Sequence, residues 1–376
     1  MSAQARPTIA LVTDAIFPYH RGGKEARYRE LAPRLATHAD VHVYTMKWWD
    51  GPRVRREGDV TYHAICPYVP LYKGNRRSVL QAVVFALACL QLLFARFDAI
   101  EADHMPYLPL FPLKLVAMVR RKRLTVTWHE CWGPDYWREY LGPPGRVGWW
   151  FERTTMQMSD AIIAASAQTG ASLREQLGER VPVVVAPNGV DLAAIHDAET
   201  SLDACDVTAV GRLIEHKRID LLLDAVALLA SDGLRVTCRV IGTGPERDAL
   251  MAQAVTLGIA DQVEFRDDVQ SAADLFPLLK AARVFAFPSA REGFGMAALE
   301  AIAAGVPVVT TTAPDNLAQH LVARSDRGIL CEPDAVALAA GIREALQHED
   351  ATLGDPWVSE YDWDHVTVRV AEAVLA

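Results

Sequence analysis

Two glutamates, Glu292 and Glu300, are separated by seven residues in a stretch whose residue types suit sugar and phosphate chemistry. Glu292 precedes a Gly-Phe-Gly turn, and Glu300 lies in the Ala/Leu-rich helical stretch that the turn opens. Glycines at such a junction let backbone N–H groups approach a ligand closely, and a helix N-terminus attracts phosphate. Because Glu300 lies roughly two helical turns beyond Glu292, the two acids cannot share one contact. We expect one acid to meet a sugar and the other a ribose; a capping acid and a surface acid are the alternative interpretation.

A pair of cations, Arg212 and Lys217, follows the strand expected at 207–210 and precedes the helix expected at 220–230. Arg can bond phosphate oxygens through two parallel hydrogen bonds, and Lys adds a point charge. The pair is therefore a candidate clamp for a diphosphate. A solvated basic loop is the alternative.

Four further features are weak when each is taken alone. Gly242-Thr243-Gly244-Pro245 is a lone G-x-G, which a tight turn also explains. Gly22-Gly23 before a helix fits a hinge or a plain turn. His129, at the end of an apolar strand, fits a packed histidine, and Asp267-Asp268 fits either a solvated turn or a contact to a nucleotide base.

Short apolar runs alternate with helical stretches along the whole chain. We expect strands at 9–12, 41–45, 99–102, 124–128, 160–165 and 183–185, then at 207–210, 235–241, 263–265, 284–288 and 306–310; helices are expected at 24–36, 79–95, 220–230, 246–257 and 295–304. Such alternation implies parallel sheets with helices on both faces. The two series, joined near residue 188, predict two doubly wound α/β domains facing each other across a cleft, with ligands outside the carboxyl ends of the strands.

Composition narrows the function classes. A chain of 376 residues with 51% hydrophobic content can build more than one core, and its net charge of −9 argues against a general nucleic-acid binder. The six cysteines include no C-x-x-C pair, which indicates reduced thiols in a cytosol. No apolar signal core precedes the first strand, so secretion is not expected. The apolar stretch 79–95 falls short of a spanning helix and is expected to be buried or amphipathic.

Taken together, the order and spacing of these motifs resemble the large retaining glycosyltransferase family with the E-x7-E signature and the GT-B fold, often called family four. The resemblance covers most of the chain, and its block from Ser289 to Val309 is highly specific. The other matching residues are Gly22-Gly23-Lys24-Glu25, His129-Glu130, Pro187-Asn188-Gly189-Val190-Asp191, Gly211-Arg212 with Lys217-Arg218, Gly242-Thr243-Gly244-Pro245 and the C-terminal Tyr361-Asp362-Trp363.

The resemblance implies transfer of a sugar from a nucleotide-diphosphate donor to an acceptor, with retention at the anomeric carbon. By similarity, Arg212 and Lys217 would neutralise the diphosphate without a metal, Glu300 would accept bonds from the ribose hydroxyls, and Glu292 would contact the transferred sugar. His129 would reach the donor sugar. The remaining donor-binding candidates are Gly22, Gly23, Gly242, Gly244, Asp268, Val269, Gly293, Phe294 and Gly295.

The resemblance also implies a division of labour along the chain. Residues 1–187 would form a Rossmann-like domain that binds the acceptor, residues 188–358 a Rossmann-like domain that binds the nucleotide sugar, and residues 359–376 a helix that crosses back to the first domain. The acceptor would be a glycan or a lipid-linked molecule. By this resemblance neither a cofactor nor a metal is expected.

Two mechanisms and two rival functions stay open. Same-face attack, in which the departing phosphate takes the acceptor proton, competes with a double displacement through Glu292. A nucleotide-sugar epimerase of similar architecture and a non-catalytic nucleotide-sugar-binding protein are the rival functions. The stretch from Thr310 to Leu317 departs from the Gly-Gly and acid that many relatives carry there; it either tunes donor choice or is a neutral variation.

The first domain contains two basic runs and several tryptophans. The basic runs are at 120–123 and Arg76-Arg77, and the tryptophans are Trp48-Trp49, Trp132, Trp137 and Trp149-Trp150. Basic clusters with nearby tryptophan suit contact with an anionic membrane surface. Ordinary surface charge over an aromatic core is the alternative. We therefore expect a cytoplasmic protein that contacts the membrane peripherally.

Overall fold

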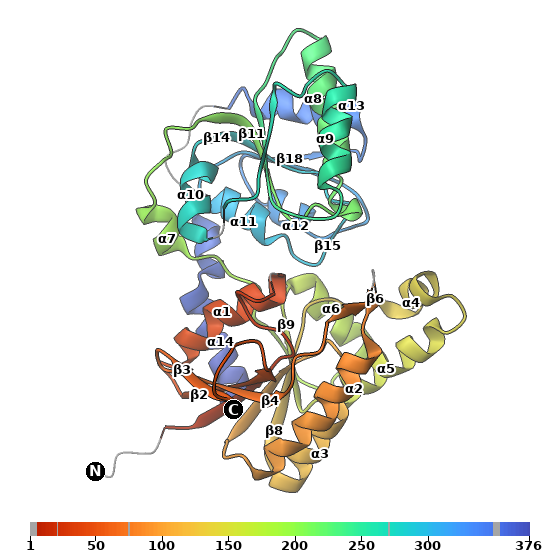
Figure 1. Cartoon of the computed structure of the whole chain (residues 1–376), viewed down its shortest axis with the longest axis vertical. Helices are drawn as coiled ribbons and strands as arrows, with labels where there is room; N and C mark the ends of the chain where they lie inside the picture. Colours follow the sequence, from red (N-terminus) through yellow and green to blue (C-terminus); the bar gives the residue numbers. More distant parts are fainter. Residues whose placement is uncertain (1–5, 21, 74–75, 270, 349–353) are drawn as a thin grey trace. The chain divides into compact units, whose positions relative to one another are not determined.

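The computed structural model describes residues 6–20, 22–73, 76–269, 271–348 and 354–376 (Figure 1). The chain divides into two compact units. Unit 1 holds the chain up to Asn188 together with Trp363–Ala376, and unit 2 holds Gly189–Asp362. From the sequence we predict domain boundaries between residues 187 and 188 and between residues 358 and 359. Each unit is a parallel sheet covered by helices, which confirms the predicted α/β fold class.

Unit 1 is built on an eight-stranded sheet in the order β10-β9-β8-β7-β1-β2-β4-β3. Every neighbouring pair is parallel except the edge pair of β3 and β4. The chain order reverses at β1, so the sheet has a topological switch point between β1 and β7, where ligands of such sheets bind. The strands are β1 (Thr8–Val12), β2 (Asp40–Met46), β3 (Val54–Glu57), β4 (Val60–Cys66), β7 (Ala99–Asp103), β8 (Arg123–Trp128), β9 (Ala161–Ala164) and β10 (Val183–Val185); β5 (Tyr72–Lys73) and β6 (Arg76–Arg77) form a small separate hairpin.

Helices cover both faces of this sheet. On one face, α14 packs against α1 and lies along β7, β8 and β9; on the other, α2 and α3 lie side by side (Figure 1). The single helix expected at 79–95 is wrong in detail, because α2 ends at Ala88 and a 3-10 helix, η1, continues to Phe94. The helical elements are α1 (Gly23–Leu35), α2 (Val79–Ala88), η1 (Cys89–Phe94), α3 (Leu110–Arg120), α4 (Gly133–Leu141), α5 (Gly145–Met158), α6 (Ala167–Leu177) and α14 (Trp363–Leu375).

Unit 2 is built on a six-stranded, all-parallel sheet in the order β13-β12-β11-β14-β16-β18. This is the 3-2-1-4-5-6 order of dinucleotide-binding folds, with its switch point between β11 and β14. A second, two-stranded sheet pairs β15 with β17. The strands are β11 (Cys205–Val210), β12 (Cys238–Ile241), β13 (Val263–Arg266), β14 (Ala282–Phe287), β15 (Arg291–Glu292), β16 (Val308–Thr311), β17 (Asp315–Asn316) and β18 (Gly328–Cys331).

The central strand β14 shows why this sheet is buried on both faces. Val284 and Ala286 belong to the core under α8 and α13, whereas Phe285 and Phe287 belong to the core under α10 and α11. Successive side chains of a strand point to opposite faces, so a continuous apolar run serves both layers. The helical elements are α7 (Leu192–Asp197), η2 (Glu215–Lys217), α8 (Ile219–Ser231), α9 (Arg247–Thr256), α10 (Ala272–Lys280), α11 (Met296–Ala303), α12 (Gln319–Val322), α13 (Ala335–Ala345) and η3 (Pro356–Tyr361).

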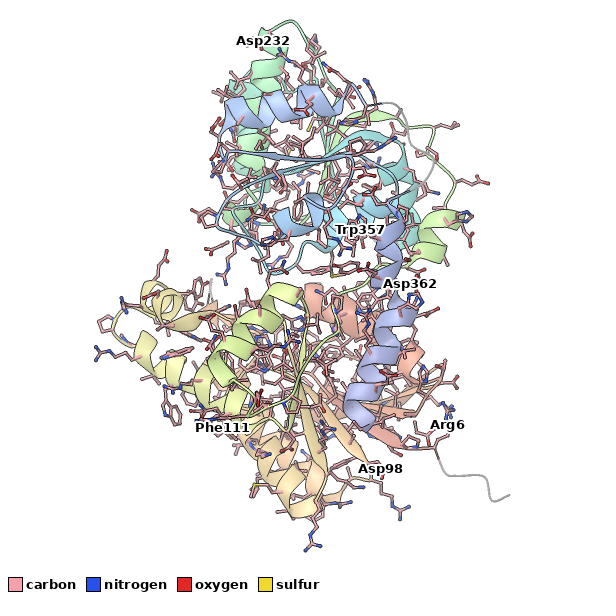
Figure 2. The ribbon with its side chains drawn as sticks, turned by 180° about the vertical axis from the view of Figure 1, so that it is seen from behind. Arg6, Asp98, Phe111, Asp232, Trp357 and Asp362 are labelled. Atoms are coloured by element: carbon pink, nitrogen blue, oxygen red, sulfur yellow. The ribbon has the colours of Figure 1, made fainter. Side chains whose placement is uncertain are left out.

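The C-terminal segment of unit 2 runs through η3, where Trp357 and Asp362 mark its course into α14 (Figure 2). Tyr361 of this segment accepts a hydrogen bond through its carbonyl oxygen from the Val190 N–H, at 2.9 Å. The start and the end of unit 2 are thereby joined to each other. Over the described ranges, none of the helices has both the length and the apolar character needed to cross a bilayer.

Candidate functional site

Lys217 and Glu292 meet at the switch point of unit 2. The Lys217 Nζ donates to Glu292 Oε1, and the Ser289 hydroxyl donates to the same oxygen at 2.8 Å. Lys217 comes from the loop after β11 and Glu292 from the loop after β14, which are the two strands that flank the switch point. The side chains are 18% and 12% exposed, so this ion pair is mostly withdrawn from water.

The backbone explains why the two loops approach each other. The His216 carbonyl oxygen accepts a hydrogen bond from the Ala290 N–H at 2.8 Å. Arg218 follows in the left-handed region at φ 53°, which ends the turn η2 and directs the chain into α8. Burial is the largest influence on His216 and, with the charge of Lys217, lowers the pKa of its imidazole.

Gly242 and Gly244 are needed for packing between loops. A Cβ at Gly242 would lie 1.8 Å from the Gly211 carbonyl oxygen, and a Cβ at Gly244 would lie 2.1 Å from that of Leu213. Real Cβ atoms do not approach backbone so closely, so any side chain would push the loops after β11 and β12 apart. Packing against the loop that carries Arg212 and Lys217 therefore requires both glycines of the G-x-G motif. Contact of these glycines with a donor stays a prediction.

The turn after Glu292 leads into α11. Gly295 is the residue before the helix, at φ 95°, and a Cβ there would lie 2.4 Å from the Ala318 Cβ. Phe294 is buried, with its ring 5.9 Å from that of Tyr361. The Phe294 side chain is thus part of the core, which leaves the backbone of Gly293 and Gly295 as the portion of the turn suited to a ligand. Glu300 lies on α11 and is half-buried.

The departing stretch from Thr310 to Leu317 is built onto the Glu292 strand. Asp315 and Asn316 pair in parallel with Arg291 and Glu292, and the Leu317 N–H donates to the Glu292 carbonyl oxygen at 3.0 Å. The Asn316 side-chain amide is buried and donates to Thr310 Oγ1 at 2.9 Å and to the Thr311 carbonyl oxygen at 2.8 Å. This stretch therefore holds Glu292 in place.

Two predicted donor residues are not joined to this group. Arg212 is exposed and forms no ion pair with any residue that the structure describes. Asp268 is exposed, and both of its carboxylate oxygens accept from Arg266 at 2.7 Å, which lowers the pKa of Asp268. Val269 beside it is half-buried.

In unit 1, a charged network lies at the switch point between β1 and β7. Lys24, at the start of α1, donates to Asp14 Oδ1 at 2.6 Å and to the Met105 carbonyl oxygen at 2.9 Å, and it lies 3.4 Å from Asp103 Oδ2. Arg77 and Gln81 complete the shell of Asp14 at 3.0 and 3.1 Å. Gly22 and Gly23 open the same helix, so the predicted glycine turn is anchored by this network.

Burial sets the electrostatics of the network. Burial alone lowers the pKa of Lys24, but Asp103 and Asp14 outweigh that effect and leave it raised. Burial alone raises the pKa of Asp103, but Lys24 and its other partners bring it well below the usual range. Both groups are therefore charged at neutral pH.

His129 follows β8 and faces the same network. Its Nε2 lies 3.7 Å from Asp103 Oδ2, which is too long for a hydrogen bond. Within the described parts of the chain this nitrogen has no hydrogen-bond partner. Burial is the main cause that lowers the pKa of His129, while Asp103 opposes it. The imidazole is thus neutral at pH 7 and retains an unused hydrogen-bonding nitrogen.

Several residues of these two sites were given no role from the sequence: Asp14, Lys24 and Asp103 as a group, and Ser289 and Asn316. One signal was present, because Asp14 and Asp103 are polar residues at the ends of apolar runs that predict buried strands. Among the described side chains, no group of three or more His, Cys, Asp or Glu residues could hold a metal ion.

Two family models match the chain: Glycosyltransferase Family 4 over residues 21–194 and Glycosyl transferases group 1 over residues 204–348. A GDP-mannose:cellobiosyl-diphosphopolyprenol alpha-mannosyltransferase from Komagataeibacter xylinus is 31% identical over 247 residues, which are 60% of this chain and 60% of that protein. The chain therefore spans about 60% of the length of this curated relative.

Solved structures show the same fold. Sucrose-phosphate synthase from Thermosynechococcus elongatus has a TM-score of 0.71 at 21% identity, covering 98% of this chain and 95% of that one. HepE from Anabaena, solved with UDP-glucose, has a TM-score of 0.71 at 20% identity, with 97% and 98% covered. With its two parallel-sheet units and both family matches, the chain belongs to the glycosyltransferases of the GT-B fold.

Proposed function

We propose that the protein is a retaining glycosyltransferase that uses a nucleotide-diphosphate sugar. The observation that carries the proposal is the Lys217–Glu292 pair at the switch point of unit 2, directly before the glycine turn of α11. A cation, an acid and a helix N-terminus then lie where a parallel sheet binds its ligand. HepE was solved with UDP-glucose bound, and the mannosyltransferase relative is named for GDP-mannose, so both support a donor of this class.

The side chains would divide the chemistry as follows. Lys217 and Arg212 neutralise the diphosphate as it leaves, which supplies the positive charge that a metal would otherwise give. Glu300 accepts hydrogen bonds from the ribose, and Glu292 contacts the transferred sugar. His129 is neutral with a free ring nitrogen, which suits a hydrogen bond to a sugar hydroxyl.

The anomeric configuration is retained if the acceptor attacks the anomeric carbon from the same face that the leaving group departs from. The acceptor oxygen bonds to the anomeric carbon, the bond from that carbon to the phosphate oxygen breaks, and the departing phosphate takes the acceptor proton. In the structure Glu292 is held by Lys217 and Ser289 on one oxygen, which suits an acid that orients a sugar. A sugar adduct trapped on Glu292 and detected by mass spectrometry would replace this route with a double displacement.

We propose a lipid-linked or glycan acceptor bound by unit 1, at the cytoplasmic face of a membrane. The name of the mannosyltransferase relative specifies a diphosphopolyprenol acceptor, which supports a lipid-linked molecule. The compartment rests on the sequence, in which six cysteines form no C-x-x-C pair.

The test begins with a thermal-shift panel of UDP- and GDP-sugars, since a bound donor raises the melting temperature in proportion to its affinity. The donor that binds is then supplied with lipid-linked and free glycan acceptors, and the product anomer is read by NMR. We expect transfer with retention, lost in Glu292→Ala while nucleotide binding stays. An isomerised sugar formed without acceptor would identify an epimerase, and an inverted product would refute retention.

A further inference from the structure

The helices of unit 1 that face away from α1 and α14 leave an unusual amount of apolar surface uncovered. Ten of the 22 large apolar side chains that are exposed among the described residues lie on α2, η1, α3 and α5. Isolated exposed apolar residues are ordinary, but a contiguous patch marks a contact surface. We call these ten side chains the apolar face: Val79, Leu80, Val83, Leu87, Phe94, Leu115, Met118, Val119, Val147 and Trp150.

The spacing of the residues shows that they form faces of helices. On α2, Leu80, Val83 and Leu87 recur at helical spacing, and Leu80 and Leu87 are 67% and 64% exposed. On α3, Leu115 and Met118 follow Phe111 at the same spacing, and Met118 is 66% exposed. Each helix therefore turns an apolar stripe to solvent as well as one to the core.

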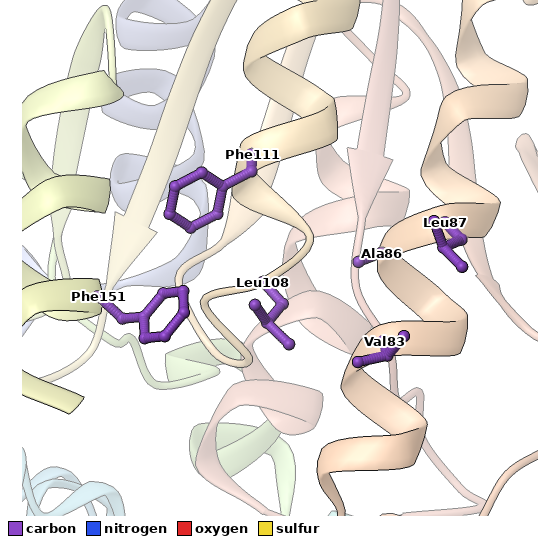
Figure 3. Close-up of a pocket in the computed structure, with 6 residues that line it drawn as sticks. All are labelled: Val83, Ala86, Leu87, Leu108, Phe111 and Phe151. Carbon is purple, nitrogen blue, oxygen red and sulfur yellow. The ribbon is translucent and has the colours of Figure 1, made fainter. Parts of the chain in front are cut away.

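A cavity joins the stripes into one surface (Figure 3). It has a volume of about 220 Å³, and all six side chains around it are apolar. Val83, Ala86 and Leu87 come from α2, Phe111 from α3 and Phe151 from α5.

Ring contacts extend the surface along α5. The Phe111 ring lies 5.7 Å from that of Phe151 and 6.3 Å from that of Trp150, which is itself exposed. The cavity, α2, α3 and α5 are thus one continuous surface.

The exposed charges on α5 are positive, whereas α4 beside it carries both signs, with Asp135 and Glu139 exposed next to Arg138. α2 and η1 carry no charged residue, and the exposed charges of α5 are Arg146 and Arg153, while its one acid, Glu152, is buried. A hollow of about 730 Å³ beside the start of α5 is lined by Arg138, Arg146 and Trp149. This basic edge belongs to a chain whose net charge is −9, so it is a local feature of the surface.

The basic run expected from the sequence at 120–123 contributes less. Arg120 donates to the Leu93 carbonyl oxygen, Lys122 pairs with Asp98 at 2.9 Å, and Arg123 donates to the Ala376 carbonyl oxygen. Three of its four side chains are therefore used within unit 1. On the α4–α5 hairpin, Arg138 lies 3.3 Å from Asp135 with both side chains exposed to solvent, whereas Arg146 and Arg153 form no ion pair with a described residue.

We propose that the apolar face is the surface by which the protein docks on an anionic lipid bilayer, with Leu87, Met118 and Trp150 among the acyl chains and Arg138 and Arg146 at the lipid phosphates. Apolar helix faces with cationic edges and a tryptophan suit the boundary between headgroups and acyl chains. A second copy of the chain fits less well, because a symmetric dimer through this face would bring its basic edges together. The inference deepens the membrane contact of the proposed function.

The test measures binding to vesicles without any sugar donor, so it is independent of transfer activity. Flotation compares phosphatidylcholine vesicles with vesicles that also contain phosphatidylglycerol, for the wild type and for three variants. Leu87→Glu/Met118→Glu alters the apolar face, and Arg138→Ala/Arg146→Ala alters the basic edge. Val336→Glu is the matched control, because Val336 is 70% exposed on α13 of unit 2.

We expect the wild type to bind the anionic vesicles, and the Leu87→Glu/Met118→Glu variant to bind them roughly tenfold or more weakly, since two apolar side chains leave the acyl layer. The arginine variant should lose a similar factor at low salt and less at high salt. The control should bind like the wild type. Thermal melting checks folding, and Leu87→Gln/Met118→Gln replaces the glutamate pair if that pair melts early.

Two results would overturn the proposal. The first is a wild type that does not bind anionic vesicles, or apolar-face variants that bind them as the wild type does. The second is a dimeric wild type whose dissociation by these substitutions leaves vesicle binding intact, which would assign the face to a second copy. Donor binding measured by calorimetry on the same samples shows separately whether the proposed function holds.

Discussion

Glu292→Gln is expected to strengthen the binding of a nucleoside diphosphate and to weaken sugar transfer. Glu292 now holds the Lys217 ammonium, so the cation proposed to bind the diphosphate is neutralised by its partner. Glutamine keeps the shape of the side chain and can still accept from Ser289, but it removes the negative charge. Lys217 is then available to phosphate at its full charge.

The size of the effect follows from the exposure of the pair. At about 4 Å, two unit charges interact by about 4 kcal/mol with an effective dielectric constant near 20. Solvent-exposed pairs retain up to about 1 kcal/mol of this after desolvation and ordering of the side chains. We use that smaller value for Lys217 and Glu292, because 18% and 12% of their side chains still contact water. We therefore expect about fivefold tighter binding. Loss of a group that acts on the transferred sugar lowers kcat by roughly 10²–10³.

Isothermal titration calorimetry with UDP and GDP measures the change in nucleoside diphosphate affinity. Transfer from the donor selected by thermal shift measures the change in kcat. Glu215→Gln is the matched control, because Glu215 is an exposed acid in the same turn as Lys217. It should change neither quantity. Weaker nucleotide binding by Glu292→Gln, or transfer at the wild-type rate, would refute the assignment of Lys217 to the diphosphate and of Glu292 to the sugar.

Three more substitutions have definite expected outcomes. Arg212→Ala should weaken nucleoside diphosphate binding by roughly 10–100-fold without lowering the melting temperature, because Arg212 forms no ion pair with the described residues; an unchanged Kd would remove it from the clamp. Gly244→Ala should lower the melting temperature by several degrees, because its Cβ would lie 2.1 Å from the Leu213 carbonyl oxygen. Gly211→Ala should not lower it, because its Cβ meets only the Lys217 side chain, at 3.8 Å and 3.9 Å. Asp103→Asn should move the acid limb of the pH profile of kcat/KM to lower pH. Burial lowers the pKa of His129 and Asp103 partly reverses that effect, so removing the Asp103 charge should lower this pKa further. A limb that stays in place or moves to higher pH would contradict a role for neutral His129.

The sheets could be predicted because their strands are buried on both faces. Ile9 to Val12 and Val284 to Phe287 read as continuous apolar runs, and the structure confirms both as central strands. The order of motifs along the chain then determined which loops follow the strands. The family resemblance assigned Lys217 and Glu292 to the same donor, but it did not predict the ion pair between them.

The Thr310–Leu317 stretch shows what local patterns cannot supply. Its two-residue strand β17 has no periodicity of its own and forms only because β15 lies beside it. Asn316 and Thr310 are polar residues in buried positions: the Thr310 hydroxyl donates to the Phe287 carbonyl oxygen, and the Asn316 amide nitrogen donates to Thr310 and Thr311, while the Asn316 Oδ1 has no hydrogen-bond partner among the described residues. The polar residues of this stretch therefore predict an exposed loop and not a part of the core. Only the assembled sheet shows that the stretch supports the backbone of Glu292. This favours a constrained structural role over neutral variation.

The network of unit 1 was missed for a different reason, which is sequence distance. Asp14 and Asp103 are 89 positions apart, and each taken alone is a turn acid after a strand. They become neighbours because β1 pairs with β7 at the switch point, where the two connections leave in opposite directions and open a gap at the sheet edge. Lys24 fills that gap at the start of α1, within reach of both carboxylates, and together with Arg77 it offsets the two buried anions. Since an unpaired charge in that position would be strongly destabilising, the three residues must act as one unit, and the Gly22-Gly23 turn owes its position to them.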